Sequence, residues 1–247
     1  MAINTKYPDW ILERACPYRD SYISFLDILG FKQLVQDERN SHKIATPYYA
    51  LQDMFASSDK DSSAGKMSLA LISDTIVLSA DASIPNIVEN VVSLTSAIIR
   101  EYWEEGIILR GAITFGKLFH DGNIVYGPAL VDAYLMERDK AVFPRVIVSK
   151  DMFQKHIVGT GFQEQFVVDA SDIHYFDFFG LFMSDFIPSE YRLDLAQGRK
   201  WLSERLLESK GEDRVYSKYE WLKSEWNKAL TKNASKGIPP IDQYMIH

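Results

Sequence analysis

The order in which strand-like and helix-like segments follow one another is the feature of this sequence that most restricts its fold. Up to about residue 155 the segments read β-α-α-β-β-α-β-β-α-β. Residues 67–81 predict two strands that meet in a turn at Ser73 and Asp74. Residues 86–106 carry apolar side chains at helical spacing over about five turns. This order is typical of an α+β fold with an antiparallel-rich sheet and helices on one face.

Local signals place the boundaries of several other segments. Thr46 and Pro47 predict the start of a helix, because Thr is a good N-cap and Pro suits the first helical position. Residues 58–66 read as a polar loop.

From about residue 172 the sequence becomes dense in aromatic residues, and residues 196–209 and 215–230 read as amphipathic helices. We interpret the aromatic residues as packing or a dimer contact rather than a cofactor site. We therefore expect residues 1–20 to be a lead-in, 20–170 to form the main domain, and 171–247 to be a helical extension packed on that domain.

Composition narrows the classes of function. The 247 residues carry a net charge of −7, which argues against a general nucleic-acid-binding or anionic-membrane surface. A polyanionic ligand therefore needs a metal or a few placed cations. The single cysteine, Cys16, excludes a disulfide framework. We find neither a secretory signal nor an apolar run long enough to span a bilayer, and so expect a cytoplasmic protein.

Two aspartates interrupt apolar, strand-like runs. Asp27 lies inside "YISFLDILGF", and Asp74 lies at the predicted turn of the hairpin. A buried charge is costly unless it is paired or binds a metal. If the first strand pairs with the hairpin, the two carboxylates meet at one sheet edge, where like charges favour a cation between them. Oxygen ligands of this kind suit Mg²⁺ or Mn²⁺ together with substrate phosphates.

The residues after Asp27 fit a phosphate ligand. Gly30 allows the chain to turn sharply before a helical segment. We expect the backbone amides of Leu29, Gly30 and Phe31 to face a phosphate at this turn.

Other polar residues predict no separate site. The five histidines are scattered without metal-ligand spacing, and no serine has a G-x-S-x-G context. Arg110 lies on a strand whose side chains alternate between the two faces of the sheet. We therefore interpret Arg110 as a structural pairing residue rather than a catalytic one.

The ordered set "FLDILGF", "ISDTIVLS", "LRGAITFGKLF" and "GNIVYGPAL" resembles the class III nucleotide cyclase homology domain. The closer resemblance is to the pyrimidine cyclases of the bacterial Pycsar anti-phage system, over roughly residues 20 to 155. The segment "KYEWLKSEWN" is also similar to the C-terminal helix of that branch.

The resemblance implies a ferredoxin-like βαββαβ palm that acts as a head-to-tail homodimer, with active sites at the interface. It assigns two divalent metals, Mn²⁺ or Mg²⁺, to Asp27, Asp74 and the carbonyl of Ile28. The implied reaction converts a nucleoside triphosphate into a 3′,5′-cyclic monophosphate and pyrophosphate, with nucleotide rather than nucleic acid or membrane as partner.

The sequence departs from the purine cyclases at two helical positions. Where those enzymes carry an Asn and an Arg that stabilise the transition state, this chain has Val131 and Leu135. Another cation must then stabilise the negative charge of the transition state. Arg138 is the first candidate, and Lys117 and Arg145 follow.

The base-reading pair of adenylyl cyclases is also missing, with Asn123 and Ile124 near the second position. This absence is consistent with the pyrimidine branch, in which a helical tyrosine meets the base. Tyr49 or Tyr48 could take that role.

These features favour a uridylate cyclase that makes cyclic UMP from UTP for a separate anti-phage effector. The alternatives are a cytidylate cyclase, a purine cyclase, and a degenerate nucleotide-binding dimerisation module. A diguanylate-type cyclase is disfavoured, because "ISDTIV" takes the place of a GG-[DE]-EF-like hairpin.

Overall fold

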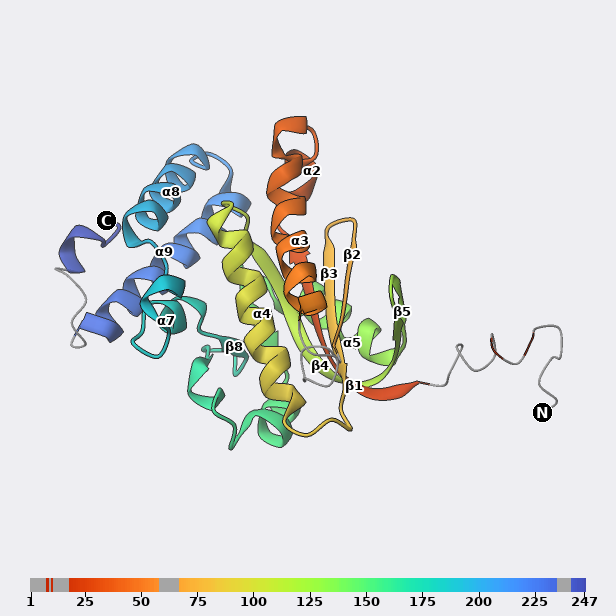
Figure 1. The fold of residues 1–247 in the computed structure, drawn as a ribbon. Helices are drawn as coiled ribbons and strands as arrows, with labels where there is room; N and C mark the ends of the chain where they lie inside the picture. Colours follow the sequence, from red (N-terminus) through yellow and green to blue (C-terminus); the bar gives the residue numbers. More distant parts are fainter. Residues whose placement is uncertain (1–7, 9, 11–17, 58–66, 235–240) are drawn as a thin grey trace.

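The structure is a computed structural model that describes residues 8, 10, 18–57, 67–234 and 241–247 (Figure 1). Most of the expected lead-in, including Cys16, and the polar loop at 58–66 lie outside the described residues.

An eight-stranded sheet forms the centre of the molecule. The strand order is β2-β3-β1-β4-β6-β8-β7, and β5 pairs with β4 outside this path. All pairs are antiparallel except β4 with β6. The strands are β1 Arg19–Ile28, β2 Met67–Ile72, β3 Thr75–Asp81, β4 Leu109–Asp121, β5 Ile124–Tyr126, β6 Val146–Val148, β7 Phe166–Val168 and β8 His174–Phe176.

The helices are distributed around this sheet. They are α2 Phe31–Leu34, α3 Ser41–Ser57, α4 Ile87–Glu104, α5 Pro128–Lys140, α6 Lys150–Met152, α7 Phe178–Phe182, α8 Leu195–Glu208 and α9 Asp213–Asn233. The expected hairpin at 67–81 and the expected helices after residues 86 and 127 are confirmed. The α+β class and the βαββαβ unit, here β1-α3-β2-β3-α4-β4, are confirmed as well.

Side-chain alternation along β1 separates two apolar layers. Leu26 and Ile28 belong to the main core, which α4 covers. Ile23 and Phe25 point to the opposite face and pack with Ala129 and Ala133 of α5. α3 and α4 share one face as expected, whereas α5, which the sequence also predicts, packs on the other face.

The start of α3 differs from the prediction. The helix begins at Ser41 and not at Pro47, which lies inside it. Proline cannot donate the usual backbone hydrogen bond, which is why it favours the first turn of a helix. Here the buried Tyr102 hydroxyl donates to the carbonyl of Ile44 at 3.0 Å and holds the preceding turn against α4. A tertiary contact therefore outweighs the local signal.

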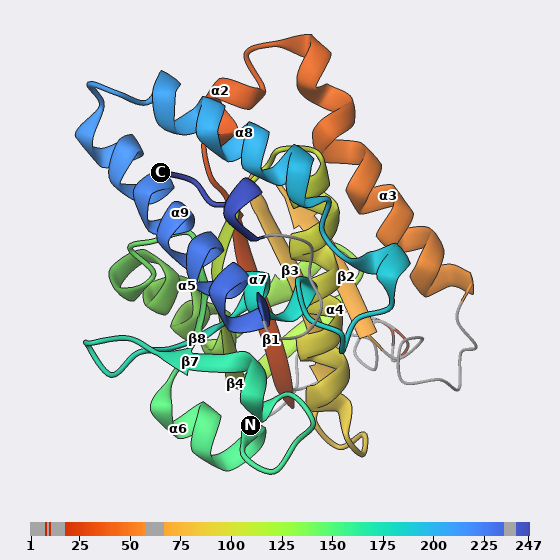
Figure 2. The same cartoon turned by 90° about the vertical axis from the view of Figure 1, so that its left-hand side faces the viewer.

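The C-terminal segment packs on the same core. Two helices form where the amphipathic pattern predicts them, and Figure 2 shows α8 and α9 side by side over one face. Leu202, Leu222 and Trp226 join the apolar cluster that also contains residues of α4. The aromatic run contributes an unexpected strand, β8, which pairs with β6.

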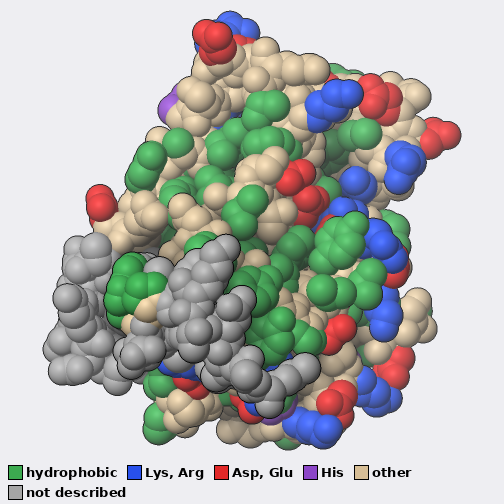
Figure 3. All heavy atoms as spheres, turned by 90° about the vertical axis from the view of Figure 1, so that its right-hand side faces the viewer, with side chains coloured by type: hydrophobic (Ala, Val, Ile, Leu, Met, Phe, Trp, Pro, Cys, Tyr) green, Lys and Arg blue, Asp and Glu red, His purple; other side chains and the backbone are tan. Residues whose placement is uncertain are grey.

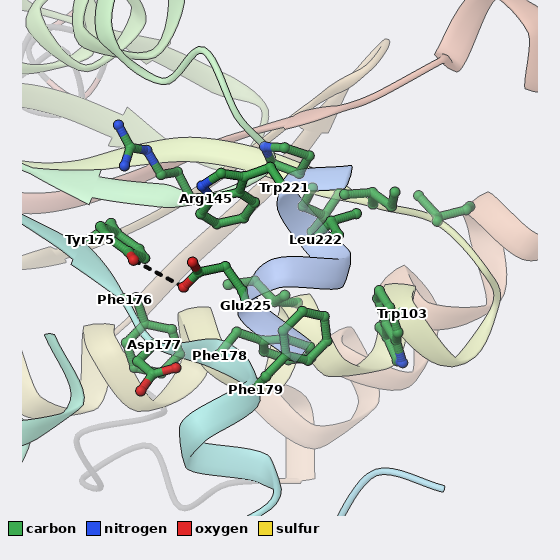
Figure 4. A pocket seen from close by; sticks show the side chains of 15 residues that line it. Trp103, Arg145, Tyr175, Phe176, Asp177, Phe178, Phe179, Trp221, Leu222 and Glu225 are labelled. Carbon is green, nitrogen blue, oxygen red and sulfur yellow. Dashed lines mark hydrogen bonds between the residues drawn. The ribbon is translucent and has the colours of Figure 1, made fainter. Parts of the chain in front are cut away.

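Polar groups also fasten α9 to the sheet (Figure 4). The Tyr175 hydroxyl of β8 donates to Glu225 of α9 at 2.9 Å, and Lys228 also pairs with Glu225. The Arg145 guanidinium lies 4.9 Å from the centre of the Tyr175 ring and pairs with Asp169 at 2.7 Å. We call these five residues the anchor cluster. The adjoining cavity is only about 40 Å³, room for about one water.

Candidate active site

Asp27 and Asp74 meet at one end of the sheet. Asp27 is the penultimate residue of β1, opposite Thr75 of β3, and Asp74 is in the two-residue turn between β2 and β3. The amide of Ile28 donates to the carbonyl of Asp74 at 2.8 Å, which ties the turn to β1. Ser73 adopts a left-handed conformation with φ 59°, which a tight two-residue turn requires. The local pairing therefore places both acids where the hairpin pattern predicts.

Asp27 lies in a mixed electrostatic environment. Its side chain is 23% exposed, and the Arg110 guanidinium on the neighbouring strand is 3.5 Å away. Burial raises the pKa of Asp27, the charge of Arg110 opposes the rise, and the charge of Asp74 adds to it. The net pKa is raised, so this fold disfavours the ionised form of Asp27 in the absence of an added cation.

Glu137 of α5 is a third acid, which the sequence analysis missed. It is buried, and it forms an ion pair with Arg110. Burial raises its pKa, and Arg110 opposes that rise. The pairing role expected for Arg110 is therefore observed, because this guanidinium lies between Asp27 and Glu137. The sequence signal for Glu137 was weak, because the apolar residues of α5 are spread around the helix and mark no single buried face.

Gly111 allows β4 to approach β1 at this point. A Cβ atom at Gly111 would lie 2.1 Å from the carbonyl oxygen of Phe25. Any larger residue would push Arg110 and its strand away from Asp27.

Lys218 of α9 is the second cation near the acids. Its ammonium interacts electrostatically with Asp27 and Glu137, and burial is the main cause that lowers its pKa. We call Asp27, Asp74, Arg110, Glu137 and Lys218 the acidic site. It combines three carboxylates with two cations.

A cavity of about 680 Å³ is lined by Lys218 of the acidic site and by residues that follow Asp27 in the chain. Its walls include Leu29 and Gly30 from the turn after β1, Ile108 before β4, and Arg205 and Lys218 from the two C-terminal helices. This volume is in the range of small-molecule sites.

The turn expected to face phosphate is only partly available. The amide of Leu29 donates to the carbonyl of Ile108 at 3.0 Å, so it is already engaged. Gly30 has φ 76° and precedes α2, and within the described residues the amides of Gly30 and Phe31 have no hydrogen-bond acceptor. The phosphate-facing role of this turn stays a prediction for Gly30 and Phe31.

The three cations considered for the transition state lie in different places. Arg138 is exposed on α5 and pairs with Asp139 at 2.6 Å. Lys117 pairs with Asp20 and lies seven residues beyond Arg110 on β4, roughly 23 Å away at about 3.3 Å per residue. Arg145 is buried in the anchor cluster, where its guanidinium pairs with Asp169 and lies over the Tyr175 ring, while its Nε has no hydrogen-bond partner among the described residues.

The two candidate tyrosines differ in exposure. Tyr49 is 63% exposed. Tyr48 is half-buried, and its hydroxyl has hydrogen bonds with Gln52 and with the backbone of Leu71, which precedes the Asp74 turn by three residues.

An exposed apolar surface covers the outer side of α5 and β5. Figure 3 views the molecule from the side of β5 and shows hydrophobic side chains gathered over part of this face. Ile124, Val131 and Tyr134 are each about half exposed or more, and Tyr126 and Leu135 are only slightly less exposed. The two positions that depart from the purine cyclases therefore lie on an apolar outer surface.

The donor set at the acidic site fits a divalent metal. Within the described part of the chain, no three His, Cys, Asp or Glu side chains form a metal-binding group. Mg²⁺ and Mn²⁺, however, commonly use one or two carboxylates together with substrate phosphates. Asp27 and Asp74 supply two carboxylates whose charges interact, and burial raises the pKa of Asp27.

Comparisons with known proteins gave structural likenesses only. Neither a scan against protein-family models nor a search of curated proteins found a match. One similar structure is the catalytic core of a rhodopsin–guanylyl cyclase with converted specificity, in complex with ATPαS. It has a TM-score of 0.44 and 17% identity, over 65% of this chain and 97% of that one.

A second similar structure is the monomeric guanylyl cyclase domain of the RhoGC fusion protein from the aquatic fungus Blastocladiella emersonii. It has a TM-score of 0.44 and 16% identity, over 65% of this chain and 96% of that one. Among the described helices, none is both long and apolar enough to cross a membrane. The function proposed below therefore rests on the residues of this chain.

Proposed function

We propose that this protein is a nucleotide cyclase that converts a nucleoside triphosphate, with UTP favoured, into a 3′,5′-cyclic monophosphate and pyrophosphate. The observation that carries the proposal is the pair Asp27 and Asp74, held together at one sheet edge. A cavity of about 680 Å³ lies near this edge, and its walls include Leu29, Gly30 and Lys218. Neither acid is needed to hold the strands together, because the backbone pairing of β1 with β3 does that.

Asp27, Asp74 and the carbonyl of Ile28 would hold the divalent metals, of which we propose two per site. When bound, such metals activate the attacking oxygen and neutralise charge on the phosphates. Arg110 pairs with both Asp27 and Glu137. Glu137 would therefore still hold the guanidinium if Asp27 bound a metal instead.

The reaction is an intramolecular displacement at phosphorus. The ribose 3′-hydroxyl releases its proton to solvent, and the 3′-oxygen forms a bond to the α-phosphorus. The bond from that phosphorus to the bridging oxygen breaks, and pyrophosphate leaves with the electron pair. The chain orients the triphosphate through the amides of Gly30 and Phe31, and the cavity excludes much of the surrounding water.

A second copy of the chain completes this proposal. The exposed apolar surface on α5 and β5 suits a homodimer contact, and it carries Arg138 at its edge. Lys117 lies far from Asp27 of its own chain, so it could act only on the site of the other copy. Arg138 is the preferred transition-state cation.

Base selection is proposed for the tyrosines of α3. Tyr48 lies beside the strand that leads to Asp74, and Tyr49 is exposed next to it. The sequence resemblance also supports a place in anti-phage signalling, in which a separate effector binds the cyclic nucleotide. CTP is the alternative pyrimidine substrate, and a purine triphosphate is the next one.

The test is incubation with each of the four nucleoside triphosphates and Mn²⁺, followed by mass identification of the product. We expect one cyclic pyrimidine monophosphate and stoichiometric pyrophosphate. Asp74→Asn should abolish the product, and Asp151→Asn, an exposed aspartate on α6, should not. Folded, dimeric, metal-loaded wild type that is inert with all four nucleotides would refute the proposal.

A degenerate nucleotide-binding dimerisation module is the second candidate. Val131 and Leu135, exposed where the purine cyclases carry polar catalytic residues, favour it. Tight binding of a nucleoside triphosphate without turnover would select this candidate.

A further inference from the structure

The C-terminal helices form one wall of the cavity beside the acidic site. Leu29 and Gly30 also line this cavity, so a ligand that reaches the turn after β1 is in the same cavity as α8 and α9. The four charged side chains on this wall are Arg205, Glu208, Glu212 and Lys218. Their charges balance formally, but they differ in how they are paired.

Arg205 and Glu208 neutralise each other. They form a salt bridge of 2.8 Å along α8, although the Arg205 Nε is buried without a hydrogen-bond partner. Glu212 precedes α9 and is exposed.

Lys218 differs because it makes no salt bridge within the part of the chain that the structure describes. It is half-buried, lines the cavity, and is close enough to Asp27, Glu137 and Arg110 to interact with their charges. A half-buried ammonium without a salt bridge beside a cavity is suited to an anionic ligand, since partial desolvation strengthens its attraction to a phosphate.

The position of Lys218 is fixed by the rest of α9. One turn later Trp221 stacks on Phe143 with ring centres 5.6 Å apart, and Glu225 is held by Tyr175 (Figure 4). The helix therefore presents Lys218 to the acidic site from a rigid attachment, and not from a loose tail.

We propose that Lys218 is a substrate-binding residue, and that its ammonium binds the terminal phosphates of the nucleotide and the pyrophosphate that leaves. This inference rests on the proposed function for the identity of the nucleotide, but binding of the polyphosphate group can be tested alone. The C-terminal extension is then part of the active site, and the ligand class it recognises is a polyphosphate.

The experiment is isothermal titration calorimetry of the full chain with inorganic tripolyphosphate and with pyrophosphate, each with and without Mg²⁺. Lys218→Met keeps the apolar stem and removes the charge, and we expect affinity to fall about 10-fold or more. Lys218→Arg should restore most of the affinity. Lys223→Met is the matched control, because Lys223 lies on the same helix, pairs with Glu220, and lines a different groove.

Kinetics give the second measurement. Lys218→Met should raise the KM for the nucleotide and weaken pyrophosphate inhibition by similar factors, with an unchanged melting temperature. Equal tripolyphosphate affinity of wild type and Lys218→Met, or no binding by wild type, would overturn the inference. If binding depends on Lys218 but no nucleotide is cyclised, the inference stands and the proposed function fails. If wild type cyclises and Lys218→Met matches it in KM and inhibition, only the inference fails.

Discussion

The acidic site and the anchor cluster use similar residues in opposite ways. In the anchor cluster Arg145 pairs with Asp169, and Glu225 pairs with Tyr175 and Lys228, around a cavity of about 40 Å³. In the acidic site three carboxylates share two cations beside a cavity of about 680 Å³. Charges that are balanced and enclosed hold elements together, whereas an unbalanced, open group keeps binding capacity for a ligand.

The largest expected effect is on stability, at the anchor cluster. Arg145→Met removes a buried cation and leaves Asp169 without its salt bridge, which should lower the free energy of unfolding by about 3–5 kcal/mol. Urea denaturation measures this change. Arg138→Met is the control for stability, because replacing that exposed arginine should not measurably change the free energy of unfolding. If both variants changed the free energy of unfolding equally, the anchor cluster would not have the structural role that distinguishes it from the acidic site.

Asp27→Asn should separate activity from stability. If the proposed function is right, losing the carboxylate should reduce cyclisation at least about 100-fold, since the proposed metal would lose a ligand. Because the fold disfavours the ionised form of Asp27, the variant should be as stable as wild type or up to about 1 kcal/mol more stable. Product analysis and thermal unfolding test the two halves. A loss of stability of more than about 2 kcal/mol would mean that Asp27 is a structural residue.

Tyr175→Phe tests how firmly α9 is attached. It removes a 2.9 Å hydrogen bond to the buried Glu225 and should cost about 1.5–3 kcal/mol. Tyr216→Phe removes a hydrogen bond of the same length to Glu220 on the surface of the same helix, and should leave stability unchanged. If α9 also carries a substrate-binding lysine, Tyr175→Phe should raise the KM as well.

The smallest effect is a difference in pH dependence. The pKa of Asp27 is raised above its ordinary value of 3.8. The ionised carboxylate therefore lowers the free energy of unfolding above the raised pKa, and this effect disappears as the pH falls toward 3.8. The stability advantage of Asp27→Asn should shrink over that interval.

Asp169 should behave in the opposite sense. Burial alone would raise its pKa, but hydrogen bonds from the Ile173 backbone and Arg145 outweigh it and lower the pKa below 3.8. Its favourable contribution is present above 3.8 and is lost as the pH falls through the lowered pKa. Unfolding curves of Asp27→Asn and Asp169→Asn between pH 3 and 7 should thus diverge from wild type in opposite directions, and parallel curves would contradict this assignment.

Local patterns were sufficient for the parts of the fold that depend on neighbours in sequence. The hairpin that carries Asp74 follows from alternation on both sides of a turn, and the apolar face of α4 follows from helical spacing. The predicted start of α3 was wrong, because the contact of Tyr102 with Ile44 joins residues that are far apart in the sequence.

The missed members of the acidic site have the same physical cause. Glu137 reaches Arg110 only because α5 crosses to the other face of the sheet, and Lys218 arrives from the far end of the chain. Nothing in the spacing of either residue indicates these partners. A sequence pattern can place a residue on an element, but the docking of that element depends on packing along the whole chain.

The central position of β1 has a consequence for how the protein is made. Among the described strands this one is synthesised first, yet its two neighbours are β3 and β4, and Lys218, whose charge interacts with Asp27, lies on α9. Such distant pairings require long loops to close. The entropy cost of closing them comes before the favourable contacts form, so folding should be slow. During synthesis the sheet can assemble while the cavity wall that carries Lys218 is still missing. The acidic site is thus complete only after α9 has been translated and has docked.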